Sequence, residues 1–122
     1  MKIANELFKK NEYSQTVGIC RYYLTLDKSN AAVYWLAGQA FEALGKTDEA
    51  RVNYYLSYLL KNRSAALLEK LWRLNENIEP AFAARCIEDY LNYESALTGA
   101  AERQKLKSLE IRLFNLYGAV SD

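Results

Sequence analysis

The chain has 122 residues, 51% of them hydrophobic, and its 16 basic and 15 acidic residues leave a formal net charge of +1. This length and composition suit one folded domain, and the near-neutral charge argues against a general nucleic-acid-binding surface. The sequence contains no histidine and carries no phosphate-binding glycine loop, zinc-type cysteine pair or nucleophile motif, so we expect no catalysis, no cofactor and no metal site.

The sequence also indicates the cellular compartment of the protein. No run of about 18 uncharged apolar residues is present, as a membrane span would require. The charged start, with Lys2, Glu6 and Lys9, lacks the apolar core of a secretory signal. Cys20 and Cys86 both lie in helical apolar patterns, where a thiol packs as a small hydrophobe, so no disulfide framework is expected. We therefore predict a soluble, cytoplasmic chain without direct membrane insertion.

The first half of the chain contains two similar copies of one pattern. A shift of the sequence by 34 residues pairs Ala4 with Gly38, Leu7 with Phe41, Asn11 with Gly45, Tyr13 with Thr47, Ser14 with Asp48, Thr16 with Ala50 and Leu26 with Leu60. Asn11 and Gly45 both tolerate the left-handed backbone conformation that ends a helix. We expect a short helix near residues 2–10, an N-terminally shortened copy over residues 1–29 and a full copy over residues 30–63.

The second copy alternates small and large apolar residues at the spacing of a helix pair, from Val33 to Phe41 and on through Gly45, Ala50 and Tyr54. This pattern resembles a tetratricopeptide repeat. The resemblance implies that Leu7, Cys20, Phe41 and Tyr54 fill the space between helices. Since one such repeat cannot bury its apolar face alone, it also implies a superhelical stack whose surface binds another chain.

The resemblance weakens over residues 64–97. An apolar stripe predicts a helix over residues 65–74, and Asn75 with Asn77 is a plausible break. Pro80 suits the first turn of a further helix that extends to about residue 96. The buried candidates on that helix are Phe82, Ala83, Cys86, Ile87, Tyr90, Leu91 and Tyr93. This segment is interpreted as a degenerate third repeat, with an unrelated helical hairpin as the alternative.

The last segment, residues 99–120, has an apolar stripe at helical spacing, formed by Leu106, Leu109, Leu113, Leu116 or Tyr117, and Val120. Its opposite face is charged, as expected of a helix that caps an open stack. The predicted fold is therefore all-α: a single tetratricopeptide-like domain over residues 1–122, a right-handed superhelix of about seven helices ending in a capping helix.

The resemblance also implies a concave groove made by the first helix of each repeat. Its positions correspond to Asn5 and Phe8 in the first copy, Ala32, Trp35, Gln39 and Glu42 in the second, and Glu69, Arg73 and Glu76 in the third. For Trp35 the alternative is packing against the short first helix. Chaperone-binding members hold a terminal carboxylate with a clamp of Lys, Asn and Arg side chains, and Gln39 and Glu42 do not match that clamp. We therefore expect an extended or helical segment bound through apolar and amide contacts.

The predicted second helices are rich in tyrosine and charge. They carry Arg21, Tyr22, Tyr23, Arg51, Asn53, Tyr55 and Tyr58. Exposed tyrosines there would suggest a second interface, and partial burial between neighbouring helices is the alternative.

The leading functional hypothesis is a non-enzymatic protein-binding module, an adaptor, scaffold or chaperone-like protein that holds a partner segment in the concave groove. One alternative is a helical accessory domain of a larger enzyme or assembly, such as a glycosyltransferase or a secretion component, which the start inside a repeat favours. Another is a self-associating scaffold, since short helical stacks with incomplete caps tend to form homo-oligomers.

Overall fold

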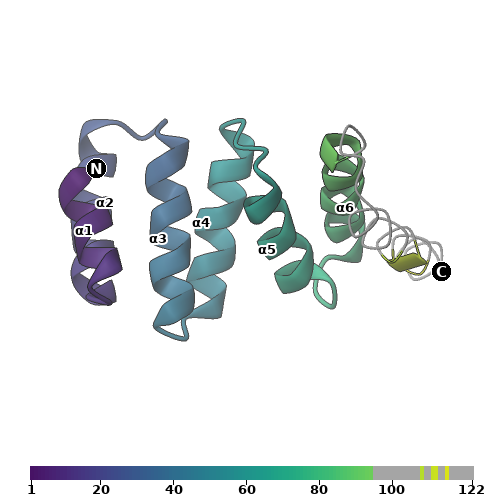
Figure 1. Cartoon of the computed structure of the whole chain (residues 1–122), viewed down its shortest axis with the longest axis horizontal. Coiled ribbons are helices and arrows are strands. Elements are labelled where there is room, and N and C mark those ends of the chain that lie inside the picture. Colours follow the sequence, from purple (N-terminus) through teal and green to yellow (C-terminus); the bar gives the residue numbers. More distant parts are fainter. Residues whose placement is uncertain (95–107, 109–110, 113–114, 116–122) are drawn as a thin grey trace. The chain divides into compact units, whose positions relative to one another are not determined.

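A computed structural model of the chain describes residues 1–94, 108, 111, 112 and 115, and every regular element among these residues is an α-helix (Figure 1). Residues 108, 111, 112 and 115 are helical, and the rest of the predicted capping helix over 99–120 lies outside the described residues. The chain forms two compact units, Met1–Asn62 and Arg63–Asp122. The prediction of a single domain with its repeat boundaries stays a prediction.

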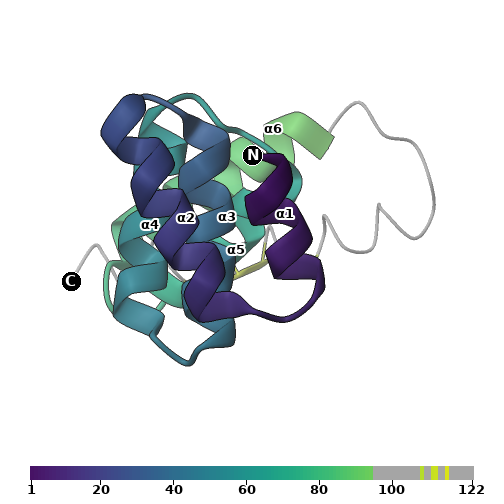
Figure 2. The same ribbon diagram turned by 90° about the vertical axis from the view of Figure 1, so that its left-hand side faces the viewer.

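Unit 1 contains two antiparallel helical hairpins. Helices α1 (Lys2–Lys9) and α2 (Tyr13–Leu26) form the first hairpin, and α3 (Ala31–Ala43) and α4 (Thr47–Leu59) form the second. Helix α2 packs against α3 and so joins the hairpins. Seen end-on, α1 and α3 lie toward one side of unit 1, and α2 and α4 lie toward the other (Figure 2). The unit therefore has one face from the first helices and one from the second helices.

The turns of unit 1 follow from residues that tolerate a left-handed backbone. Asn11 has a φ of 62° and Gly45 a φ of 76°, which confirms the helix ends predicted from the paired Asn and Gly. Asn30 begins α3, and its side-chain oxygen accepts hydrogen bonds from the backbone N–H groups of Ala32 and Val33 at 3.1 and 3.3 Å. Lys61, which follows α4, also has a positive φ, 74°, although the residue at that position is neither Gly nor Asn.

The core of unit 1 lies between the hairpins. Its central cluster comprises Ala4, Cys20, Val33, Leu36 and Ala37, from three different helices. Of the four predicted packing residues, Cys20, Phe41 and Tyr54 are buried, whereas Leu7 is only half-buried. The difference arises because α3 packs against both α2 and α4, whereas α1 packs mainly against α2.

Gly38 sets the spacing of the α3–α4 hairpin. A Cβ atom built on Gly38 would lie 2.5 Å from both Cδ1 and Cε1 of the Tyr54 ring, so the buried ring packs directly against the α3 backbone. The predicted small residue and its large neighbour therefore meet, as a repeat of this kind requires.

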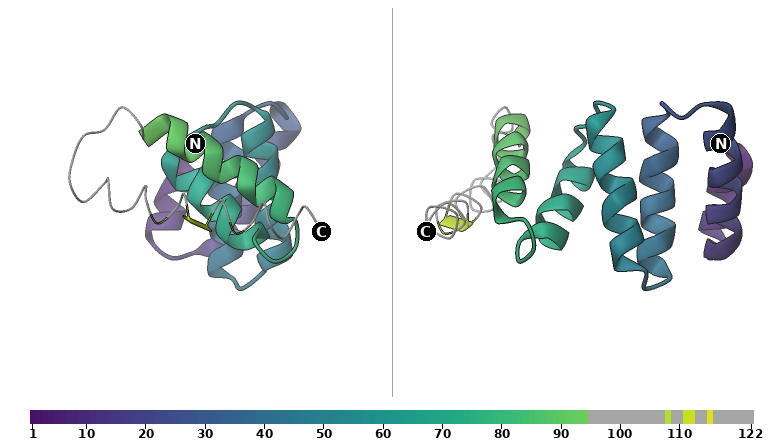
Figure 3. Two further views of the ribbon diagram at one scale, coloured as in Figure 1. Left: turned by 90° about the vertical axis from the view of Figure 1, so that its right-hand side faces the viewer. Right: turned by 180° about the vertical axis from the view of Figure 1, so that it is seen from behind.

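Unit 2 contains a third helical hairpin, formed by α5 (Ala65–Asn75) and α6 (Pro80–Glu94) (Figure 3). Ser64 caps α5, with its Oγ accepting the N–H of Leu67 at 3.3 Å, and Pro80 opens α6 as predicted. The buried interface consists of Leu67, Leu68, Leu71, Trp72, Ala83, Ala84, Cys86, Ile87 and Tyr90. The two predicted helices are thus present, within about two residues of the expected ends.

Candidate functional site

Helix α3 presents the predicted groove residues on one face. Ala32, Trp35, Gln39 and Glu42 are spaced so that they share one side of an α-helix. Ala32 is exposed, and the other three side chains are half-buried. The buried residues Ala37 and Phe41 lie on the opposite side of the same helix, because two residues of helix correspond to a rotation of about 200°. Helix geometry therefore separates Ala37 and Phe41 from the predicted groove residues of α3.

Tyr54 of α4 contacts two of the predicted groove residues of α3, Trp35 and Glu42. The ring centroids of Trp35 and Tyr54 are 5.3 Å apart with an interplanar angle of 43°. The Tyr54 hydroxyl donates a hydrogen bond to Oε1 of Glu42 at 2.7 Å. Burial raises the pKa of Tyr54, and the hydrogen bond to Glu42 and the charge of that carboxylate raise it further. Tyr54 thus fixes two of the predicted groove residues, a role that repeat spacing alone did not reveal.

Helix α1 contributes less of its predicted surface. Asn5 is exposed and stays a candidate contact. Phe8 is half-buried and packs against the core cluster around Ala4 and Cys20, with its ring 5.5 Å from the Tyr13 ring in an edge-on contact. Of the two groove positions predicted on α1, Asn5 is therefore exposed to solvent, whereas Phe8 packs against the core.

The three predicted positions of unit 2 lie along α5 and at its end. Arg73 Nη2 forms an ion pair with Glu69 Oε1 at 2.6 Å, one helical turn away. Glu76 Oε1 lies 3.2 Å from Arg112 Nε. Among the three, the one basic side chain is thus already matched by an acidic neighbour. The set does not form a concentrated positive site.

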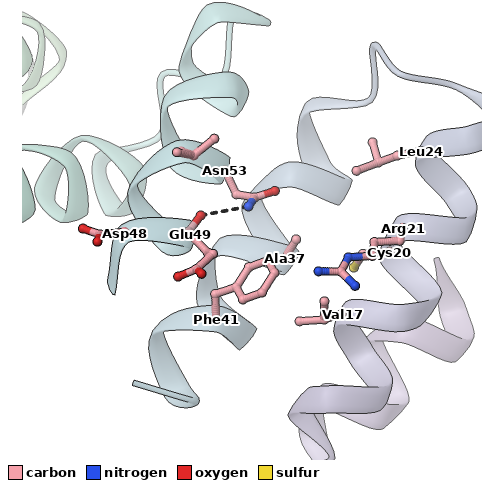
Figure 4. A pocket seen from close by; sticks show the side chains of 10 residues that line it. Val17, Cys20, Arg21, Leu24, Ala37, Phe41, Asp48, Glu49 and Asn53 are labelled. Atoms are coloured by element: carbon pink, nitrogen blue, oxygen red, sulfur yellow. Dashed lines mark hydrogen bonds between the residues drawn. The ribbon is translucent and has the colours of Figure 1, made fainter. Parts of the chain in front are cut away.

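A pocket that the sequence did not predict lies on the other side of α3 from the predicted groove residues. It is an open pocket between α2, α3 and α4 with a volume of about 390 Å³ (Figure 4). We call it the outer pocket. It is lined by Val17, Cys20, Arg21, Leu24, Ala37, Phe41, Asp48, Glu49, Val52 and Asn53. Such a volume is near the lower end of known small-ligand sites.

The tyrosines of the second helices divide between core and surface. Tyr58 is buried, Tyr23 is half-buried, and Tyr22 and Tyr55 are exposed. The two exposed tyrosines lie on α2 and α4, and neither of them lines the outer pocket. Of the residues that the sequence singled out on the second helices, Arg21 and Asn53 line the pocket.

The two thiols are placed for packing. Cys20 and Cys86 are both buried and unbridged. Burial raises the pKa of Cys20 from 9.0 to about 11 and that of Cys86 to about 12, so both thiols stay protonated at neutral pH. No His, Cys, Asp or Glu cluster among the described residues could hold a metal ion. Within the same residues, no helix has the length and apolar character needed to cross a membrane.

The sequence matches no protein-family model and no curated protein sequence. The structure is similar to solved helical-repeat proteins at low sequence identity. The type III secretion chaperone SycD of Yersinia enterocolitica, solved with a peptide of the translocator YopD, has a TM-score of 0.66 at 14% identity, over 95% of this chain and 88% of that one. The Sgt2 tetratricopeptide domain of Aspergillus fumigatus has a TM-score of 0.67 at 15% sequence identity, over 92% of this chain and 75% of that one.

The second tetratricopeptide domain of human RPAP3, solved with an HSP70 peptide, gives a TM-score of 0.68 at 16% identity, over 89% of this chain and 90% of that one. At these identities the likeness concerns the fold. The chain therefore has an all-α, tetratricopeptide-like fold, which confirms the prediction from the repeat pattern.

Proposed function

We propose that this chain is a protein-binding module that holds an extended or helical segment of another protein on the groove face, defined as Asn5 of α1 with Ala32, Trp35, Gln39 and Glu42 of α3. The observation that carries the proposal is the setting of Trp35. Its ring is packed on Tyr54 and is still half-buried rather than covered. A rigid, partly accessible tryptophan is a typical binding hot spot. Proteins of the same fold have been solved with bound peptides.

The mechanism is pre-organisation. The Tyr54 ring supports Trp35, and the Tyr54 hydroxyl holds Glu42 through a 2.7 Å hydrogen bond, so neither side chain needs to be ordered when a partner arrives. The incoming segment then bears most of the loss of conformational freedom. Trp35 would supply apolar contact area, and the amides of Gln39 and Asn5 would pair with polar groups of the segment.

The charges of the groove face favour a neutral or basic segment over an acidic tail. Glu42 lies on this face, and no basic residue stands among the five positions that define it. The RPAP3 domain was solved with the acidic peptide SGPTIEEVD. We propose that this chain does not share that ligand class, because a terminal carboxylate would meet the Glu42 charge without a compensating cation.

We further propose that the module is non-enzymatic and acts in the cytoplasm. The buried, unbridged thiols of Cys20 and Cys86 suit a reducing compartment. The chain could work alone as an adaptor or chaperone-like scaffold, or as the accessory domain of a larger enzyme or assembly. In either setting the groove face would be the binding surface.

A comparative pull-down tests the proposed binding surface. The wild-type chain and a Trp35→Ala/Gln39→Ala variant are used as baits in an extract of the source cells. We expect at least one protein to be retained by the wild type and lost with the variant. Gln15→Ala, an exposed amide on α2, is the matched control and should retain the same proteins. A protein set that is identical for all three baits, with the variant still folded, would contradict the proposal.

A further inference from the structure

The α4 wall of the outer pocket is acidic. Asp48 and Glu49 contribute carboxylates to it, and both residues are exposed. Asn53, the third polar residue of this wall, donates a hydrogen bond from Nδ2 to the backbone oxygen of Glu49 at 2.8 Å, drawn as a dashed line in Figure 4. Its amide nitrogen is thus turned back to its own helix. The wall therefore favours a group that carries a positive charge and donates hydrogen bonds.

The charges that line the pocket do not cancel. The opposite wall, on α2, carries one cation, Arg21, whose guanidinium points toward the Phe41 ring in Figure 4, with Cζ 6.0 Å from the ring centroid. Asp48 Oδ1 lies 3.7 Å from Arg51 Nη1, but the Asp48 side chain is 92% exposed, and such exposed pairs are weak. Among the described residues Glu49 forms no ion pair. Two carboxylates against one guanidinium leave the pocket negative, which favours a cationic occupant.

The remainder of the pocket is apolar. Its floor includes the buried residues Ala37 and Phe41 of α3. Val17 and Leu24 of α2 and Val52 of α4 border this floor, and Val52 is 57% exposed. Because Val17 and Leu24 are seven residues apart on one helix, the α2 wall extends for about 10 Å, close to two helical turns. The pocket can therefore seat about two turns of another helix.

We propose that the outer pocket is a second protein-binding site, which takes a helix of a partner protein that pairs an apolar with a basic side chain. One large apolar side chain of that helix would lie over the Phe41 ring. A Lys or Arg four residues away, and so on the same face of the partner helix, would reach the carboxylates of Asp48 and Glu49.

Two observations favour such a helix over a small molecule or a second copy. The pocket is open, and about 390 Å³ is near the lower end of small-ligand sites, so a free ligand would stay largely in water. A side chain held on a helix gains further contact from the exposed Val52. In a symmetric pair of copies the carboxylates of Asp48 and Glu49 would outnumber the Arg21 guanidinium groups, leaving acidic charge unmatched.

This second site does not depend on the groove face. Ala37 and Phe41 lie on the opposite side of α3 from Trp35 and Gln39, so both surfaces can be occupied at once. A chain with two binding faces could hold two partner segments, or two parts of one partner with a gain in avidity.

A peptide selection tests the proposal. The bait is the full chain with Trp35→Ala, which removes the central contact of the groove face, and the probe is a displayed library of helical peptides. The selected peptides should pair a large apolar residue with a Lys or Arg four positions away. They should bind an Asp48→Asn/Glu49→Gln variant of this bait about tenfold more weakly, because the acidic wall is neutralised. Changing the Lys or Arg of the peptide to Glu should weaken binding to the original bait at least as much.

The matched control is Glu6→Gln/Glu12→Gln in the same bait, which removes equal charge from two exposed positions outside the pocket and should leave peptide affinity unchanged. Circular dichroism checks that each variant is folded, and the charge reversal on the peptide tests the same contact without altering the chain. Three results would overturn the proposal: a selection that yields no peptides or acidic ones, peptides whose affinity the neutralised wall does not change, or a dimer of the chain that the neutralised wall dissociates, which would make a second copy the occupant.

Discussion

Replacing Gly38 with alanine should lower the free energy of unfolding by about 2 kcal/mol, within the range of overpacked cores. The added methyl would lie 2.5 Å from two carbon atoms of the Tyr54 ring. That ring cannot retreat cheaply, because it is fully buried and its hydroxyl is hydrogen-bonded to Glu42. The clash must therefore shift α3 against α4 or break the hydrogen bond.

The control for this prediction is the other helical glycine of unit 1. Gly18 lies within α2, and nothing would come within 4 Å of a Cβ there. Gly18→Ala should raise stability by about 0.5–1 kcal/mol, because alanine loses less backbone entropy in a helix. Urea unfolding followed by circular dichroism compares the two variants. A Gly38→Ala protein as stable as Gly18→Ala would show that Tyr54 does not pack as described.

Replacing Trp35 with alanine should weaken partner binding by about tenfold to a hundredfold, the range of a truncated interface tryptophan. It should also reduce stability by about 1 kcal/mol, because the contact with the Tyr54 ring at 5.3 Å is lost. The expected readouts are titration calorimetry with the partner recovered by pull-down and urea unfolding of the free chain.

Trp35→Phe separates the two effects. Phenylalanine retains a ring that can pack on Tyr54, so stability should stay near the wild-type value. Its smaller surface and missing indole N–H should still reduce affinity. If Trp35→Ala destabilised the chain strongly while leaving affinity unchanged, Trp35 would be a packing residue, and the groove face would lose its central contact.

Much of the local fold could be predicted from the sequence, because it depends on residues with special backbone properties. Asn11 and Gly45 marked two helix ends, and both have positive φ values. Pro80 marked the start of α6. Lys61 could not be predicted, because lysine has no preference for a positive φ and takes it here at the end of α4.

Less of the candidate site could be predicted from the sequence, because the surroundings of its side chains depend on contacts between helices. Repeat spacing placed Trp35 and Glu42 on one face, but the hydrogen bond and ring contact through Tyr54 join α3 to α4. The outer pocket likewise requires side chains from three helices at once. Its lining residues Val17 and Val52 show no distinctive pattern within any single helix.

Mapping the amide chemical shifts of the labelled chain during titration with the partner segment shows whether the groove face holds that segment. We expect the signals of the Trp35 indole, the side-chain amides of Asn5 and Gln39 and the Glu42 backbone amide to shift with one common dissociation constant. Shifts confined to the outer pocket around Phe41, with the Trp35 indole unmoved, would contradict it.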